Sequence, residues 1–286
     1  MTVSLKTAIF PMAGRASRLM PLTKAVNKAL LPIYDKPLLH WALNEARACG
    51  IERFVFVVNE GDRSPVDYVR TDENLLAYFR NKKDQPQAEA MVDFLQDLSF
   101  FERRATLVAQ KTPKGLGDAV LCAADYVEGM PFAVILVDDF IYSAKEGCLQ
   151  QLQRGWQTQG GAWVALQEVA AEDVHRYGIM AVDEDKREQG NDKAIGYRAA
   201  GIVEKPSVAA APSRLAVVGR YILPFEIMGL LRQTQVGAGG EVQLTDALAA
   251  YRQEGGALYG LPFTGRRFDC GCLDGWREAN RALGGQ

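Results

Sequence analysis

A strand, a helix and a second strand follow one another within residues 6–59, and this order constrains the fold more than any other feature. Residues 6–14 (KTAIFPMAG) are a short apolar run ending in glycine, which is typical of a buried parallel strand. Residues 36–50 place Leu39, Leu43 and Ala46 on one helical stripe, and residues 52–59 (ERFVFVVN) predict another buried strand. Such a unit forms a right-handed crossover in a parallel sheet. We therefore expect an α/β fold.

The remaining sequence continues this alternation. We expect strands at residues 105–110, 131–139, 161–169 and 215–223, and helices at residues 115–127 and 241–256. Residues 61–104 are polar and mixed, and we interpret them as an insertion over one edge of the sheet; residues 183–192 (DEDKREQGND) predict a solvated loop or hairpin tip. Because no repeat, low-complexity tract or clean linker divides the chain, we predict one domain over residues 1–286.

The overall charge balance argues against a polyanionic partner. The net charge is −2 with a pI near 5.9, so we expect neither a nucleic acid nor a membrane surface to be the ligand. Five cysteines without framework spacing indicate reduced thiols and a cytoplasmic protein, and two histidines leave few candidates for a nucleophile–histidine apparatus. Basic residues that cluster near the N-terminus are therefore a local feature, which suggests a small anionic ligand.

The basic cluster surrounds a glycine turn at the end of the first expected strand. In MAGRASR, Gly14 allows close approach of the backbone to a ligand, and successive N–H groups can form an anion nest. Arg18 and Lys28 add formal charge to this loop. The pattern is neither the dinucleotide fingerprint G-x-G-x-x-G nor a Walker loop. The pattern alone is consistent with two interpretations: a phosphate-binding loop, or a glycine turn whose basic side chains are solvated.

Acidic residues follow two of the expected strands. Asp138 lies in VDD at the end of residues 131–139, and Asp269 lies in RFDCG after another expected strand. Mg²⁺ commonly takes one or two carboxylates plus substrate phosphates, so this pair predicts a magnesium site. For Asp138 alone, a helix N-cap or an Asx turn is the alternative.

Two further segments carry polar groups suited to a nucleotide and a sugar. Gln110 has an amide that both accepts and donates hydrogen bonds, as a uracil-type edge requires, and Gly115 allows close backbone approach before a helix. In GIVEKP, Glu204 and Lys205 precede a proline, which favours extended backbone with the two side chains facing opposite ways. A surface turn at residues 110–117 and a charged pair at a strand end are the alternatives.

Taken together, these motifs resemble the bacterial UTP–glucose-1-phosphate uridylyltransferases of the sugar-phosphate nucleotidyltransferase superfamily. The similarity runs from Lys6 to about Trp276, and the motifs stand in the family's order. They read PMAGRASRLMPLTKAVNKALLP, KGLGDAVLCA, AVILVDD, RYGI, GIVEKP, LAVVGRYIL, GEVQLTDAL and FDCG. The resemblance implies a Rossmann-like, mixed but mostly parallel central sheet flanked by helices. It also implies an enzyme that forms UDP-glucose and pyrophosphate from UTP and glucose-1-phosphate with Mg²⁺, in a family whose members often form dimers or tetramers.

The resemblance also implies roles for individual residues. It assigns the nucleotide to Ala13, Gly14, Gln110 and Gly115, and Mg²⁺ to Asp138 and Asp269. The sugar would meet Gly178 and Glu204, and the sugar phosphate would meet Lys205. Arg18, Lys28 and Lys205 are then the catalytic side chains, with Arg18 and Lys28 on the phosphates of UTP.

The chain departs from the family pattern mainly in its first loop. Arg15 stands where the family has leucine, Ala16 where it has its second loop glycine, and Ser17 where it has threonine. Asn27 and Ala29 flank Lys28 in place of the usual proline and glutamate, whose side chain reaches the nucleoside in the family. Two alternatives stay open: a non-catalytic regulatory paralogue that binds UDP-glucose, and a nucleotidyltransferase with another base or sugar. Arg18 is retained, which favours activity.

Overall fold

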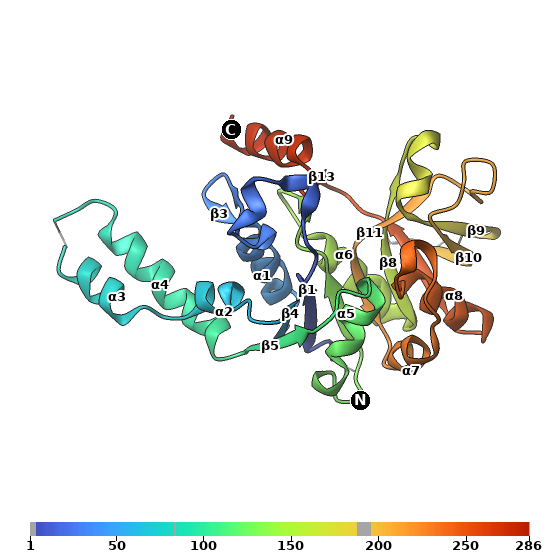
Figure 1. Cartoon of the computed structure of the whole chain (residues 1–286), viewed down its shortest axis with the longest axis horizontal. Coiled ribbons are helices and arrows are strands. Elements are labelled where there is room, and N and C mark those ends of the chain that lie inside the picture. The colour runs from blue at the N-terminus through green and yellow to red at the C-terminus, as the bar shows by residue number, and fades with distance from the viewer. Residues whose placement is uncertain (1–3, 83, 188–195, 286) are drawn as a thin grey trace.

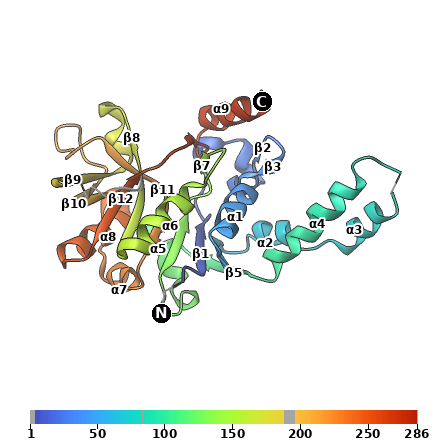
Figure 2. The ribbon, with the colours of Figure 1, turned by 180° about the vertical axis from the view of Figure 1, so that it is seen from behind.

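The computed structural model describes residues 4–82, 84–187 and 196–285. Within these residues, nine strands form a central sheet in the order β5-β4-β1-β6-β11-β8-β12-β10-β9, with helices packed around it (Figures 1 and 2). The strands are β1 (Thr7–Pro11), β4 (Arg53–Asn59), β5 (Ala105–Gln110), β6 (Phe132–Ile135), β8 (Ala162–Glu168), β9 (Gly178–Arg187), β10 (Tyr197–Glu204), β11 (Leu215–Leu223) and β12 (Leu258–Pro262).

Most strands of this sheet run in one direction. β5, β4, β1 and β6 are mutually parallel, and α1 (Leu38–Ala48) makes the expected crossover from β1 to β4. β11 is antiparallel to both β6 and β8, and β10 is antiparallel to β12 and β9. Because β12 is parallel to β8, only β11 and β10 oppose the others in the described sheet. The predicted mixed, mostly parallel α/β sheet is confirmed.

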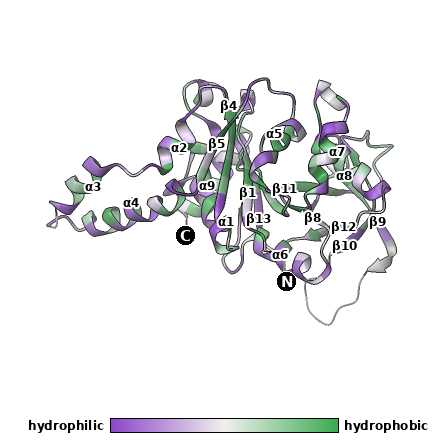
Figure 3. Cartoon of the chain, turned by 90° about the horizontal axis from the view of Figure 1, so that it is seen from below, coloured by the Kyte–Doolittle hydropathy of each residue, from purple (hydrophilic) through white to green (hydrophobic). Residues whose placement is uncertain are grey.

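Alternating residues of the central strands build a core on each face of the sheet. Phe10, Phe54 and Phe56 point to one face, while Ile9 and Val55 point to the other. Each of these side chains is fully buried, which contributes roughly 1.5–3 kcal/mol per residue. The first core includes α1 and α6 (Cys148–Gln159); the second includes α5 (Leu116–Cys122), α7 (Glu226–Gln233) and α8 (Leu244–Gln253). Figure 3 shows the apolar strands between helices of mixed polarity.

Residues 61–104 form three helices between β4 and β5. These are α2 (Ser64–Val69), α3 (Glu73–Arg80) and α4 (Ala88–Glu102). Leu95, Leu98 and Phe101 of α4 are buried against the core, whereas α3 and the start of α4 extend away from the β5 edge of the sheet (Figure 1). No helix in the described part of the chain is long and apolar enough to cross a bilayer.

Two small sheets lie beside the central one and complete the fold. β7 (Asp139–Tyr142) pairs with β13 (Arg266–Asp269), and β2 (Pro32–Ile33) pairs with β3 (Lys36–Pro37). The strand expected over residues 131–139 therefore ends early: Leu136 N–H donates to Gly219 O at 2.8 Å, and Asp139 starts a new strand. After β13 the chain continues into α9 (Leu273–Gly284).

The solvated loop or hairpin tip expected over residues 183–192 was wrong for residues 183–187. Residues 183–187 belong to β9, because β9 pairs with β10 as far as the contact between Arg187 and Tyr197. Residues 188–192 lie outside the described part of the chain.

Candidate active site

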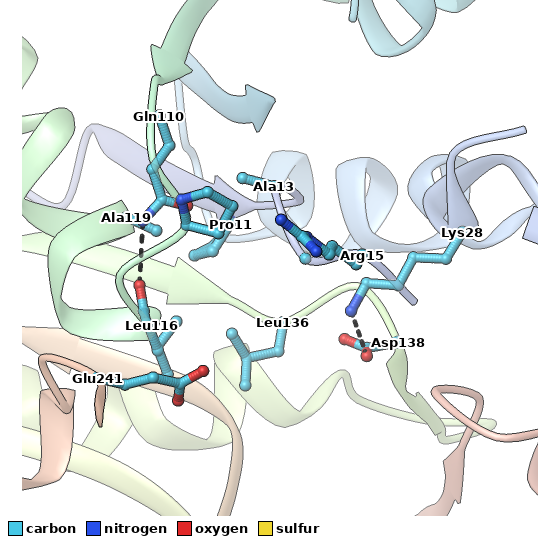
Figure 4. Close-up of a pocket in the computed structure, with 13 residues that line it drawn as sticks. Pro11, Ala13, Arg15, Lys28, Gln110, Leu116, Ala119, Leu136, Asp138 and Glu241 are labelled. Atoms are coloured by element: carbon cyan, nitrogen blue, oxygen red, sulfur yellow. Dashed lines mark hydrogen bonds and ion pairs between the residues drawn. The ribbon is translucent and has the colours of Figure 1, made fainter. Parts of the chain in front are cut away.

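An open cavity of about 480 Å³ lies at the carboxyl ends of β1, β5 and β6. This is the edge at which parallel α/β sheets bind ligands. Six residues expected in the site line it, namely Ala13, Gly14, Lys28, Gln110, Gly115 and Asp138. The other lining residues are Pro11, Arg15, Pro113, Leu116, Ala119, Leu136 and Glu241 (Figure 4). The structure thus gathers the residues expected to hold the nucleotide.

One wall of the cavity is built by close contact between residues 114–117 and residues 241–242. Gly115 has a φ of +103°, and a Cβ atom there would lie 2.7 Å from Glu241 Cβ and 2.8 Å from Val242 O. Glycine is therefore required at this position. Gln110 is 3% exposed, and its Nε2 donates to Gly115 O at 3.2 Å and to Asp118 Oδ2 at 2.7 Å. Because these bonds use both amide hydrogens of Gln110, its oxygen is the group left to offer a ligand.

The two carboxylates expected to hold Mg²⁺ converge on one point. Cys270 N–H donates to Asp138 O at 2.8 Å, which joins the segment after β13 to the segment after β6. A Cβ atom added to Gly271 would lie 2.9 Å from Asp138 Oδ2 and 3.0 Å from Asp269 Oδ1. Arg18 Nη2 would lie equally close to this Cβ atom, at 2.9 Å, so glycine leaves room for the two carboxylates and the Arg18 guanidinium to meet. Two converging carboxylates fit Mg²⁺, which takes its other ligands from water and substrate phosphates.

Basic side chains are paired with both carboxylates. Lys28 Nζ lies 2.5 Å from Asp138 Oδ2, and Arg18 Nη1 lies 3.5 Å from Asp269 Oδ2. Burial alone would raise the pKa of Asp138, but Lys28 and then Arg18 outweigh it, so the pKa is lowered. The carboxylate is therefore ionised at neutral pH, as metal binding requires. Arg18 lies outside the lining of the 480 Å³ cavity, at its metal end.

The neighbouring Asp139 has a structural role instead. Its Oδ1 accepts from Arg267 Nε at 2.6 Å, and both side chains are largely buried. A Cβ atom on Gly219 would lie 2.6 Å from Asp139 Cβ. Burial raises the pKa of Asp139 even though Arg267 opposes the shift. Only the first acidic residue of VDD therefore faces the cavity.

The residues expected to bind the sugar lie together outside this cavity. Gly178 is the register partner of Glu204, and a Cβ atom on Gly178 would lie 2.7 Å from Thr245 Oγ1 and 3.3 Å from Glu204 Oε2. Glycine here brings β9 close to the first turn of α8. The glycine therefore leaves the Glu204 carboxylate unobstructed on this side.

The extended backbone conformation expected at Lys205 was wrong. Its φ is +43° rather than extended, because its N–H donates to Tyr177 O at 2.9 Å as β10 ends. The turn brings Lys205 Nζ to 3.3 Å from Glu204 Oε1, so the two side chains meet instead of facing opposite ways.

The expected site omitted three side chains that the structure adds. Arg176 Nη2 lies 3.0 Å from Asp269 Oδ2 and Arg176 Nη1 lies 3.2 Å from Asp173 Oδ1. Arg15 and Glu241 line the cavity from its two sides (Figure 4). Each of the three belongs to a motif already recognised, in RYGI, MAGRASR and GEVQLTDAL, but their contacts depend on distant parts of the chain.

Comparison with known proteins decides the family. The profile of the nucleotidyl transferase family matches residues 8–285. The chain belongs to this family. It is 36% identical over 96% of its length to a UTP–glucose-1-phosphate uridylyltransferase of Pseudomonas aeruginosa, covering 94% of that protein. It is 35% identical over 93% of its length to the protein of that name from Bacillus subtilis, covering 87% of it.

Solved structures agree with this assignment. A UDP-glucose pyrophosphorylase complexed with UDP-glucose superposes with a TM-score of 0.84 at 34% identity, covering 98% of this chain and 99% of that one. A UTP-bound enzyme of the same kind from Acinetobacter baumannii gives 0.82 at 31% identity, covering 98% and 93%. The chain is therefore an enzyme of the uridylyltransferase group of nucleotidyl transferases, and the resemblance read from its motifs is confirmed.

Proposed function

We propose that the chain forms UDP-glucose and pyrophosphate from UTP and glucose-1-phosphate. The convergence of Asp138 and Asp269 around Gly271, at one end of a cavity that ends at Gln110, carries the proposal. Relatives that are 36% and 35% identical carry the name of this activity, and similar solved structures hold UTP or UDP-glucose.

The nucleoside end of UTP fits the cavity between Gln110 and Gly115. Gln110 offers its amide oxygen to a base N–H, such as the one that uracil carries. Ala13 and Gly14 follow β1 and present backbone rather than large side chains to the ligand. Glucose-1-phosphate would then lie toward Gly178 and Glu204, with Lys205 on its phosphate.

The reaction depends more on neutralising the charge of the phosphates than on transferring a proton. A phosphate monoester has a second pKa of about 6, so glucose-1-phosphate is mostly a dianion at neutral pH and needs no general base. Its phosphate oxygen attacks the α-phosphorus of UTP, a new P–O bond forms, and the bond to the β-phosphate breaks to release pyrophosphate. Lys205 orients the attacking anion, and Arg18 and Lys28 neutralise the charge that moves to the leaving group.

Asp138 and Asp269 would hold one Mg²⁺ ion. When bound, this ion supplies electrostatic stabilisation of phosphate charge and a fixed orientation for the two substrates. The chain's own contribution is to keep Asp138 ionised, since Lys28 and Arg18 lower its pKa, and to let the two carboxylates and Arg18 converge at Gly271.

Pyrophosphate release from purified protein tests this proposal. The assay contains Mg²⁺ and glucose-1-phosphate and compares UTP, dTTP, ATP, CTP and GTP. Turnover confined largely to UTP supports the proposal and shows that Ala29 does not abolish base selection. Strong turnover with another nucleotide retains the chemistry but changes the substrate.

The regulatory alternative has its own signature in the same assay. Ala16, at the position of a family glycine, holds a φ of +48°, and this altered loop is the observation that favours a non-catalytic paralogue. Folded protein that binds UDP-glucose but releases no pyrophosphate with any of the five nucleotides would establish that alternative.

The proposal also covers the oligomeric state and the location of the protein. A dimer or tetramer is expected from the family resemblance, and light scattering of the purified chain checks it. A cytoplasmic location agrees with the five cysteines, all of which are free thiols.

A further inference from the structure

Arg15 lies where two cavities of the active site meet. It lines the 480 Å³ cavity and also a second, polar cavity of about 280 Å³. The two cavities share Gly14, Arg15 and Lys28. The second cavity continues along the loop after β1, and its other lining residues are Ala16, Thr23, Lys24, Ala25, Val26, Asn27, Asn59, Asp62 and Ser64. Figure 4 shows the guanidinium of Arg15 beside Ala13, with Glu241 on the far side of the first cavity.

Arg15 differs from Lys28, Arg18 and Arg176 because it has no ion-pair partner among the described residues. Lys28 is paired with Asp138, and Arg18 and Arg176 with Asp269. Among the residues that the structure describes, no carboxylate lies within ion-pair distance of Arg15. Its five N–H donors are therefore available to a ligand.

The chemistry of the second cavity selects an anion. Lys24 lines it as a second cation without a described carboxylate partner, and Thr23 and Ser64 add hydroxyl groups. Asp62, the acidic residue of the cavity, is occupied by hydrogen bonds from Asn27 and Ser64. A planar guanidinium binds phosphate oxygens in pairs, which a leucine at this position could not do.

We propose that Arg15 binds the terminal phosphates of the nucleoside triphosphate. This inference rests on the proposed function for the identity of the nucleotide, but not for the phosphate chain itself. The α-phosphate lies near Asp138, and the β- and γ-phosphates extend past Arg15 toward Lys24. Arg15 thus adds a charge contact to a loop whose family counterpart has leucine there. Its contribution to triphosphate affinity is the part that binding measurements without turnover isolate.

Calorimetric titration of the full chain, with a chelator to exclude metals, tests this assignment. The ligands are UTP, UMP and inorganic tripolyphosphate, and the variants are Arg15→Leu, Arg15→Lys and, as a control, Arg232→Leu. Arg232 is an exposed cation on α7, away from both cavities, so its variant removes the same charge elsewhere. Circular dichroism confirms that each variant is folded.

We expect Arg15→Leu to weaken UTP and tripolyphosphate roughly tenfold, because it removes a charge-assisted contact, and to change UMP affinity less than about twofold. Arg15→Lys should retain part of the affinity, and Arg232→Leu should match the wild type. Equal tripolyphosphate affinity in wild type and Arg15→Leu overturns the assignment. So does an equal loss for UMP and UTP, which would move Arg15 to the α-phosphate or nucleoside. Tripolyphosphate binding that depends on Arg15 would support the assignment even if UTP bound no more tightly than tripolyphosphate. That second result would contradict the proposed nucleotide.

Discussion

The two ends of the candidate site, proposed above for the phosphates and for the sugar, are built in different ways. At the phosphate end, a loop without long strands carries Arg15, Arg18 and Lys28, and ion pairs with carboxylates from distant segments hold Arg18 and Lys28. At the sugar end, Gly178 and Glu204 are fixed by the β9–β10 pairing. Departures from the family pattern concentrate in the loop, where a side chain can change without altering a strand register. The sugar end has less freedom, since a Cβ atom on Gly178 would meet Thr245 at 2.7 Å.

The loop takes a backbone conformation at residue 16 that suits a glycine. Ala16 takes the left-handed conformation that a glycine would take, with φ +48° and ψ +37°. Thr23 Oγ1 donates to Ala16 O at 3.0 Å, and Leu19 is 1% exposed, so the loop is anchored on both sides of Arg18. The loop therefore combines an added cation at Arg15 with an anchored backbone.

The largest effect is expected at the carboxylates. Asp138→Asn should reduce pyrophosphate release by on the order of 10²–10³ or more at fixed Mg²⁺, because it removes a charge from the metal pair. The protein should stay folded with a modestly lower thermal stability, because Lys28 loses its charged partner but lines an open cavity. Normal turnover at the same Mg²⁺ concentration would move the metal site elsewhere.

The matched control is the adjacent residue. Asp139→Asn leaves the largely buried Arg267 without its charged partner, so it should lower the free energy of unfolding by on the order of 3 kcal/mol. Chemical denaturation measures this loss. If Asp138→Asn unfolded the protein while Asp139→Asn only abolished its activity, the assignment of a functional role to Asp138 and a structural role to Asp139 would be contradicted.

Arg18→Ala should lower kcat by on the order of 10²–10³ if Arg18 stabilises charge that develops on the leaving group. UTP affinity, measured by calorimetry without Mg²⁺, should fall much less. An unchanged kcat would refute this role, whereas equal losses in affinity and in kcat/KM would assign Arg18 to ground-state binding.

At the sugar end, Lys205→Ala should raise KM for glucose-1-phosphate by about 10- to 100-fold, because a charge-assisted contact contributes about 1.5–3 kcal/mol. KM for UTP should change little. Lys205→Arg serves as the charge-conserving control and should recover part of the loss. A larger effect on UTP than on the sugar phosphate would place Lys205 at the phosphate end.

Local patterns predicted the strands well, and they indicated two residues that line the cavity. Residues 105–110 and 215–223 were expected as strands and are β5 and β11 with the same bounds. Gln110 and Gly115 follow directly from their position at a strand end and a helix start. In each case the information lies in one short segment, where hydrophobic pattern and turn chemistry agree.

Contacts between distant segments account for what the sequence did not reveal. The sequence alone does not distinguish Asp138 from Asp139. Only the pairing of β7 with β13 brings Arg267 next to Asp139. Arg176 reaches Asp269 across 93 residues of sequence. A proline after Lys205 predicted extended backbone, but the hydrogen bond to Tyr177 O imposes a turn. Tertiary hydrogen bonds overrode local preference at these positions.

The strained loop offers a smaller test. Ala16→Gly should raise the free energy of unfolding by roughly 0.5–1 kcal/mol, because the cost of a left-handed alanine exceeds the added entropy of glycine in the unfolded chain. Ala25→Gly is the control. Because Ala25 has a φ of −125°, this change should not raise the free energy of unfolding. Chemical denaturation measures both, and equal effects would exclude strain at Ala16.

The smallest effect concerns the hydrogen bonds that hold Asn27, the residue at the family's proline. Asn27 Nδ2 donates to Asp62 Oδ2 at 2.8 Å. Burial alone would raise the pKa of Asp62, but hydrogen bonds from Asn27 and Ser64 lower it below the ordinary value for an aspartate side chain. A lowered folded-state pKa stabilises the protein above the unfolded-state value, and this stabilisation is lost as the pH falls through the folded-state pKa. Asn27→Ala should therefore cost about 0.5–1 kcal/mol near pH 7 and less below pH 3.8.

Denaturation curves at several pH values measure this difference between wild type and Asn27→Ala. Asp62→Asn is the companion variant, because it removes the titrating group while retaining an acceptor for Asn27 and Ser64. If the pH dependence of the wild type persists in Asp62→Asn, the titration belongs to another group. A cost of Asn27→Ala that stays constant down to pH 3 would instead show that Asn27 acts through the cap it forms with Ala29 N–H, at 2.9 Å, and not through Asp62.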